Sequence, residues 1–402
     1  MGGNAIKTVE TRRLNKAEYE ALRDEVVGII SRLRSEYLEL CHKSEAPPNR
    51  YASRHVEEVA SYRNKPDFGD LDLLVSEPLL LPPRPELSLR EYIGIRLKDI
   101  SQEVVHNTAR RSSEEQTECG SDECFESRAS TISFEYKNFQ VDLIFTPEPL
   151  VEAAHLYYGY NDLGNLLGKI AKAQGLRYGH KGLYWEYRRG TQHIKDLYVT
   201  RDLEVIADML GVDAEVWKKG FDTLEDIFEF VVNSKYFDTS IFQHENTNCV
   251  DRIRNRKRKV YEQFLQYIAT EKVLSRKASF WDYGERYSEA KKAGQEATLA
   301  HMSYKRSEAL SKLLTRFPKF KSEYLKATDD VYIRDTYKTR FNASIVRDVT
   351  GIADDDGQTL GEFMKFIKDD PESWPVRVLL KSNQSIIDWI EMTFAKWKSS
   401  KT

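Results

Sequence analysis

Cysteine is scarce in this sequence: four residues among 402, which do not form the basis of a disulfide framework. Long apolar runs are also absent, since no stretch approaches the ~18 residues that a membrane-spanning helix needs. The first residues, MGGNAIKTVETRRLNKAEYEAL, contain no apolar core of the kind found in signal peptides. We therefore expect a protein of the cytoplasm or another intracellular compartment, with no membrane partner.

Neither sign of charge is in large excess. The chain has 61 Lys and Arg against 64 Asp and Glu, a net charge of −3, so these totals indicate no class of partner. With 40% hydrophobic residues, a chain of this length has room for two or three domains. Strand-like patterning ends near residue 213. We expect an α+β domain over residues 1–213 and a mainly helical region over 214–402.

Local patterning predicts the main elements, because apolar residues at helical spacing indicate helices and alternating ones indicate strands. The expected elements are a helix at 15–42, strands at 55–62 and 71–75, a helix at 89–100, a hairpin at 131–147, a helix at 162–174 and a hairpin at 182–200. Asp162 is the expected N-cap of the 162–174 helix. The polar residues 106–130 are expected to form a loop.

Two pairs of residues have the spacing of metal ligands. Four residues separate Cys119 from Cys124, and four separate His244 from Cys249. Together they would supply the four ligands of a zinc site. The segment TECGSDECFESR around the first pair has the composition of a polar loop, however, and this favours the loop.

Three aspartates form the most informative pattern. Asp70 and Asp72 follow Gly69 in KPDFGDLDLLVSEP and take positions i and i+2 of an expected strand, so their side chains point to one face. Asp142, in VDLIFTP, lies on a later strand. Carboxylates gathered on adjacent strands repel one another unless cations lie between them, and such oxygen ligands suit Mg²⁺. Taken alone, GDLD is more often a turn that leads into a strand.

Residues 15–213 resemble the palm and nucleotide-binding part of family X DNA polymerases, the polymerase-beta-like branch of the nucleotidyltransferase superfamily. VEEVASYRNKPDFGDLDLLV is similar to the family's Gly-Ser-x-Arg-Arg stretch followed by Gly-Asp-x-Asp. The run from Asp142 through Tyr157 and Tyr158 to Asp162 and Asn165 is similar to the family's later motifs and keeps their spacing. The resemblance implies an α+β nucleotidyltransferase palm.

The resemblance also implies roles for individual residues. Asp70 and Asp72 would bind two Mg²⁺ ions, or Mn²⁺ in their place, and Asp142 would bind the catalytic ion and help to take the proton of the primer hydroxyl. The implied nucleotide-binding residues are Gly69, with Ser61 and Arg63 at the triphosphate, Tyr157 and Tyr158 at the sugar, and Asp162 and Asn165 at the base. Lys169 stands where the family has a template-contacting arginine. Without the resemblance, the tyrosines would be core aromatics and Asp162 only a helix cap.

The chain departs from the family pattern in several places. Ala60 stands in place of the first glycine and Asn64 in place of the second arginine, which weakens one phosphate contact. The family's lyase domain and helix-hairpin-helix elements have no counterpart, so removal of 5′-deoxyribose phosphate is not expected. The C-terminal half does not align with the family.

A basic segment, VDRIRNRKRKVYEQFLQYI, lies in that second half. Six of the eight residues from 252 to 259 are basic: Arg252, Arg254, Arg256, Lys257, Arg258 and Lys259. Basic side chains neutralise phosphates, and interleaved aromatics can stack on bases. We expect this segment to bind nucleic acid. The alternative is a solvated helix face whose aromatics fill a core.

These observations predict a Mg²⁺-dependent nucleotidyltransferase that adds a nucleoside monophosphate from a nucleoside triphosphate to a DNA or RNA 3′ end and releases pyrophosphate. The leading hypothesis is a DNA-polymerase-like enzyme that fills gaps during repair. The alternatives are an RNA terminal transferase acting on tRNA-type ends, a nucleic-acid-binding protein with a degenerate transferase core, and a transferase that modifies proteins or small molecules.

Overall fold

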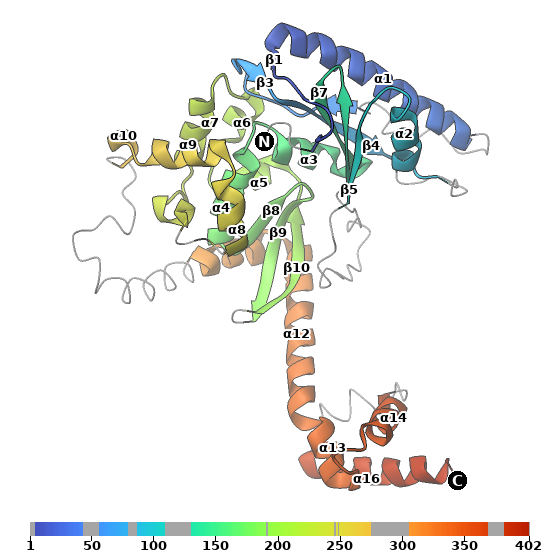
Figure 1. Cartoon of the computed structure of the whole chain (residues 1–402). Coiled ribbons are helices and arrows are strands. Elements are labelled where there is room, and N and C mark those ends of the chain that lie inside the picture. The colour runs from blue at the N-terminus through green and yellow to red at the C-terminus, as the bar shows by residue number, and fades with distance from the viewer. Residues whose placement is uncertain are drawn as a thin grey trace. The chain divides into compact units, whose positions relative to one another are not determined.

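The computed structural model describes residues 5–42, 56–78, 87–108, 130–189, 192–244, 247, 249–274, 305–368 and 382–401. The chain divides into two compact units, Met1–Arg316 and Phe317–Thr402. The first is a mixed α+β unit that contains all the described strands, and the described part of the second is helical (Figure 1).

A mixed five-stranded sheet forms the centre of the first unit. Its strand order is β2-β4-β7-β6-β5, with β4 and β7 parallel and the other neighbours antiparallel. The strands are β2 (Val56–Glu58), β4 (Asp70–Glu77), β5 (Val104–Thr108), β6 (Ser130–Tyr136) and β7 (Phe139–Pro147). A small pair joins β1 (Leu14–Asn15) to β3 (Asp67–Phe68), and an antiparallel sheet of order β10-β9-β8 comprises β8 (Leu176–Gly179), β9 (Gly182–Arg189) and β10 (Gln192–Thr200).

Helices surround these sheets. In chain order, the described part of the first unit contains the helices α1 (Lys16–His42), α2 (Leu89–Leu97), α3 (Val151–Tyr158), α4 (Leu163–Ala173), α5 (Leu203–Leu210), α6 (Ala214–Lys219), α7 (Leu224–Val232), α8 (Cys249–Arg256), α9 (Lys259–Ile268) and α10 (Glu271–Leu274). Short 3₁₀ turns occur at Glu148–Leu150 and Thr239–Phe242, and residues 305–316 are also helical.

The main core lies between one face of the five-stranded sheet and helices α1 and α2. Apolar residues of α1 such as Val26 and Ile30 pack with strand residues such as Leu71 and Leu143, and all four are buried. Burying such a side chain contributes roughly 1.5–3 kcal/mol. Because this face is filled, the functional side chains of β4 and β7 point to the opposite face.

The second unit has an apolar core of its own. Its helices are α12 (Pro318–Arg340), α13 (Ala343–Thr350), α14 (Gly357–Lys368) and α16 (Asn383–Ser399). Phe363, Phe394 and Trp397 pack against one another, with Phe363 fully buried. The helix α13 ends at Gly351, whose φ of 69° is the left-handed conformation that favours glycine.

Most predicted elements are confirmed, and the change to helical structure after residue 213 holds for every described element. Two predictions are wrong. The strand expected at 55–62 comprises only β2, because the chain turns away at 61–66. Residues 104–108 form β5 against β6, although they overlap the expected 106–130 loop. The rest of that loop, with Cys119 and Cys124, lies outside the described residues.

Candidate functional site

The register of β4 against β7 brings the three predicted aspartates together. Asp72 lies directly opposite Asp142, and Asp70 lies opposite Gln140. Because side chains alternate along a strand, Leu71 and Leu143 beside the aspartates point into the core, whereas all three carboxylates share the other face of the sheet. Asp142, on the parallel neighbouring strand β7 and 70 residues after Asp72, therefore completes the group of three carboxylates that Asp70 and Asp72 of β4 begin.

The three carboxylates are close enough to share an ion. One oxygen from each aspartate lies within 4.8 Å of the others, and among the described residues they are the one group of His, Cys, Asp or Glu side chains with this property. Gln140 Nε2 donates to both carboxylate oxygens of Asp142, at 3.0 Å each. Its Oε1 accepts from the backbone N–H of Ala5 at 2.9 Å, which fixes the orientation of the amide. The oxygen donor set fits a hard cation such as Mg²⁺.

Burial and mutual repulsion disfavour the ionised carboxylates. Burial, followed by the charges of Asp70 and Asp142, raises the pKa of Asp72 to about 8. Burial raises the pKa of Asp142 to about 6, against the opposing effect of a hydrogen bond from Ser133. A cation between the carboxylates would remove both costs. The site is thus electrostatically incomplete without positive charge.

These shifted pKa values predict a pH-dependent response to Mg²⁺. Without the ion, Asp72 is protonated in the folded state up to a pH of about 8, so its burial costs increasing stability as the pH rises from its ordinary pKa of 3.8 to about 8. Because Mg²⁺ requires ionised carboxylates, we expect it to raise the melting temperature more at about pH 8.5 than at about pH 6. Asp72→Asn should abolish the shift. Thermal unfolding with and without Mg²⁺ checks this, and an equal shift at both pH values would contradict it.

The predicted triphosphate residues lie in the loop between β2 and β4. Ser61 is half-buried there, and Gly69 directly precedes β4. Arg63 is exposed and forms an ion pair with Asp222 through Nε. Its Nη1 also donates to the carbonyl of Lys219 at 2.9 Å. Arg63 thus joins this loop to the segment between α6 and α7, an arrangement that its sequence did not reveal.

Tyr157 and Tyr158 lie at the C-terminal end of α3, on the same face of the sheet as the aspartates. Their rings meet edge to face at 5.3 Å, and Tyr158 stacks on His180 with ring centroids 5.8 Å apart. Burial, with a smaller contribution from Asp72, raises the pKa of Tyr158 to about 12. Both tyrosines are half-buried rather than core residues, so they form an aromatic wall beside the carboxylates.

Asp162 occupies the N-cap position of α4, but its side chain does not cap the helix. It instead forms an ion pair with Nη1 of Arg258, and the two side chains are only 11% and 7% exposed. Asp162 is therefore the N-cap residue of α4, as predicted, but its side chain pairs with Arg258 and makes no capping hydrogen bond. Asn165 lies one turn further along α4, and its Nδ2 is buried with no hydrogen-bond partner among the described residues. That donor is therefore unsatisfied within the described part of the chain.

The basic segment divides into buried and exposed residues. Arg258 is buried in its pair with Asp162, and Arg252 is half-buried and donates to the carbonyl of Thr247 at 3.0 Å. Four residues of the segment have exposed side chains and remain predicted nucleic-acid contacts: Arg254, Arg256, Lys257 and Lys259. The charge of Arg254 opposes the rise in the pKa of Tyr158 and contributes to the lowered pKa of Lys169. Arg254 therefore lies near the aromatic wall.

Lys169, expected to meet the template, is 8% exposed and forms an ion pair with Asp251 at 3.1 Å. Lys172 contacts the same carboxylate at 3.1 Å. Asp251 lies on α8, so α4 is joined to the basic segment by two lysines here and by Asp162 at its N-terminal end. Any contact between Lys169 and a template would have to compete with Asp251.

Sequence reasoning missed three residues at this site. Gln140 lies two residues before Asp142 on the same strand, so the alternation rule could have found it. Lys65, whose ammonium feels the charges of Asp70 and Asp72, has no counterpart in the family motif. Nothing in the sequence marks His180, whose pKa burial lowers to about 4 and whose Nε2 is buried without a hydrogen-bond partner among the described residues.

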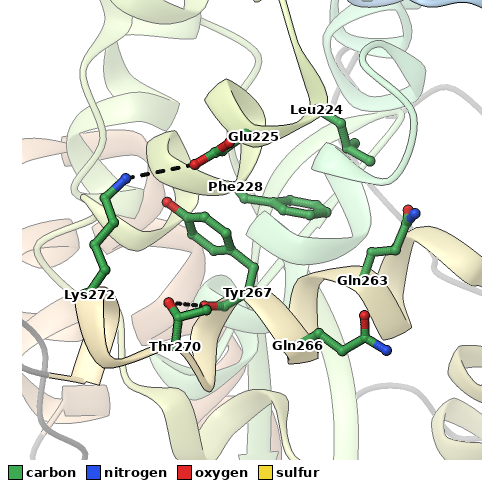
Figure 2. A pocket seen from close by; sticks show the side chains of 8 residues that line it. All are labelled: Leu224, Glu225, Phe228, Gln263, Gln266, Tyr267, Thr270 and Lys272. Atoms are coloured by element: carbon green, nitrogen blue, oxygen red, sulfur yellow. Dashed lines mark hydrogen bonds and ion pairs between the residues drawn. The ribbon is translucent and has the colours of Figure 1, made fainter.

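A shallow groove lies elsewhere in the first unit, between α7 and α9 (Figure 2). Leu224 and Phe228 contribute its apolar surface, and Tyr267 and Lys272 lie at its edge. None of the residues lining it is a predicted site residue, and some of its polar groups contact one another: Lys272 lies 3.7 Å from Glu225, and the hydroxyl of Thr270 donates to the carbonyl of Tyr267. The groove therefore adds nothing to the candidate site.

Comparison with known protein families finds no family model that matches the chain, and comparison with curated proteins finds no match either. No described helix is long and apolar enough to cross a membrane.

Of the possible zinc ligands, His244 is described, and its Nε2 contacts Glu262 at 2.9 Å. The site must therefore be interpreted from its own residues.

Proposed function

We propose that this protein is a Mg²⁺-dependent nucleotidyltransferase with a polymerase-beta-like palm. It transfers a nucleoside monophosphate from a nucleoside triphosphate, with or without the 2′-hydroxyl, to the 3′ end of a nucleic acid. The observation that carries the proposal is the register of β4 and β7, which gathers Asp70, Asp72 and Asp142 on one face of the sheet. Three half-buried carboxylates this close together repel one another, which is costly unless they bind cations.

The reaction needs an attacking hydroxyl, an α-phosphorus and a leaving pyrophosphate. The 3′ oxygen forms a bond to the α-phosphorus, the bond to the β-phosphate oxygen breaks, and the hydroxyl proton leaves the acceptor. Bound Mg²⁺ would lower the pKa of the hydroxyl and stabilise charge on the pyrophosphate. Asp70 and Asp72 would hold both ions, and Asp142 would hold the ion at the hydroxyl.

The surroundings of Asp142 suit its proposed second role, which is to accept the proton of the attacking hydroxyl. Burial favours the protonated form of its carboxyl, which makes it a better proton acceptor than an exposed aspartate in the same role. Gln140 restricts its orientation by donating to both oxygens. The aromatic wall of Tyr157 and Tyr158 would flank the sugar, and the free Nδ2 of Asn165 would reach the base.

The basic segment supports a nucleic acid as the acceptor. Its exposed cations include Arg254, which lies near Tyr158 at the aromatic wall. Cations placed beside a nucleotide site neutralise the phosphates of the strand that approaches it. A small-molecule or protein acceptor would not need them.

A substrate panel tests the proposed function. The protein is incubated with Mg²⁺, labelled deoxynucleotides or ribonucleotides, and either gapped DNA or single-stranded RNA. Template-dependent extension of gapped DNA supports a polymerase that acts in repair, and addition only to RNA ends supports an RNA terminal transferase. Tight nucleic-acid binding with no transfer to any acceptor would leave only a degenerate transferase core and refute the proposal.

A further inference from the structure

Two cations in the loop after β2 have opposite surroundings. Arg63 and Lys65 are separated by Asn64, and both precede the aspartates of β4. The resemblance to family X polymerases assigns the triphosphate contact to Arg63. The hydrogen bonds of the two side chains indicate a different assignment.

The guanidinium of Arg63 is engaged by protein at all three nitrogens, with its longest contact from Nη2 to the carbonyl of Gly220 at 3.5 Å. Its Nε pairs with Asp222, and its Nη1 donates to the carbonyl of Lys219, the last residue of α6. The backbone makes a further contact with the same segment, because the N–H of Arg63 donates to the carbonyl of Phe221 at 2.9 Å. A cation at a helix C-terminus interacts favourably with the helix dipole. Arg63 therefore has the contacts of a structural residue that ties the loop to α6.

The glycine that follows α6 shows how closely this contact is fitted. Gly220 has a φ of 73°, and a Cβ atom there would lie 3.3 Å from Arg63 Nη1 and 2.5 Å from the hydroxyl of Tyr160. A triphosphate at Arg63 would have to compete with these contacts for the guanidinium donors.

Lys65 lacks such partners. Its Nζ lies over the ring of Phe68, 4.6 Å from the centroid, and no described residue accepts a hydrogen bond from it or pairs with it. The side chain is half-buried, and burial lowers its pKa whereas the nearby charges of Asp70 and Asp72 raise it. An ammonium group has three donors. Among the described residues these donors have no hydrogen-bond acceptor, and the charges of Asp70 and Asp72, the carboxylates that would hold metal, act on the ammonium.

Metal binding would leave this ammonium in need of an anion. Once cations neutralise Asp70 and Asp72, those carboxylates no longer attract Lys65. The negatively charged oxygens of a triphosphate would then be suitable acceptors for the ammonium group. We propose that Lys65, and not Arg63, is the cation of this loop that binds the triphosphate. The inference rests on the proposed function and specifies one of its contacts.

The test compares Lys65→Met with Arg63→Met in the full chain. Calorimetry with Mg²⁺ measures the Kd of an α,β-methylene nucleoside triphosphate, which resists transfer, and of the corresponding monophosphate. Lys65→Met should weaken triphosphate binding about 10–100-fold, in line with loss of a charge-assisted contact, and leave the monophosphate nearly unchanged. Lys65→Arg should retain part of the preference. Lys98→Met, at the exposed lysine that follows α2, is the matched control.

Arg63→Met should instead lower the melting temperature and keep the ratio of the two Kd values. The affinity of Lys65→Met for Mg²⁺ alone should be equal or higher, because a nearby positive charge has been removed; this separates the predicted effect from damage to the fold. The inference is overturned if Arg63→Met removes the triphosphate preference, if Lys65→Met leaves it intact, or if the native protein shows none. A native protein that binds triphosphate through Lys65 but transfers nothing would defeat the proposed function and leave this inference standing.

Discussion

Replacing Asp142 by Asn is expected to reduce nucleotide transfer by a factor on the order of 10³ or more. The amide keeps the shape of the side chain but loses the charge that would hold the ion at the attacking hydroxyl. It also loses the proton-accepting group whose pKa burial raises to about 6. Initial rates of nucleotide addition, measured at saturating Mg²⁺, check this prediction.

The fold should survive this substitution, since an amide at residue 142 removes a repelled negative charge from a buried cluster. We expect the metal-free variant to be as stable as the native protein or more so. Asp99→Asn, at an exposed aspartate just after α2, is the control and should transfer at the native rate. If Asp142→Asn retained substantial transfer, the assignment of the three carboxylates would be wrong.

The second large effect is expected at the buried ion pair of Asp162 and Arg258. Arg258→Met should destabilise the first unit by about 3–5 kcal/mol, because it leaves the Asp162 carboxylate buried without its partner. Asp162→Asn combined with Arg258→Met should cost less than Arg258→Met alone, since no unpaired charge then remains. Urea unfolding of the single and double variants measures both quantities.

Lys257→Met is the matched control for this pair, because it removes the same charge one residue away from an exposed position. It should change stability by no more than about 0.5 kcal/mol. Equal losses for Lys257→Met and Arg258→Met would show that the pair contributes nothing beyond general charge, and that the basic segment is not anchored to α4 through it.

The sequence alone predicted that Asp70 and Asp72 share one face of a strand, because the alternation of side chains along a strand is a local property. Two residues at i and i+2 of a strand share a face whatever the rest of the fold. The position of Asp142 required one further assumption, that its strand lies beside the first, and the register of β4 and β7 confirms it. The hairpins and helices of the first half were predictable for the same reason, since their periodicity is strong.

What could not be predicted depends on pairing between distant segments. Asp162 has every local property of an N-cap, but Arg258, 96 residues later, provides a stronger partner in a buried setting. Arg63 matches the family motif, yet the α6–α7 segment occupies its donors. The basic segment looked like a uniform nucleic-acid surface, and only the fold separates buried Arg258 from exposed Arg254.

One measurement tests nucleotidyl transfer most directly. The protein is given Mg²⁺, a nucleic-acid 3′ end, and the same nucleoside triphosphate labelled with ³²P at either the α or the γ position. The account predicts that the α label becomes attached to the acceptor and that the γ label is released as pyrophosphate in equal amount. Appearance of the γ label on the acceptor, or release of inorganic phosphate without addition to the 3′ end, would contradict it.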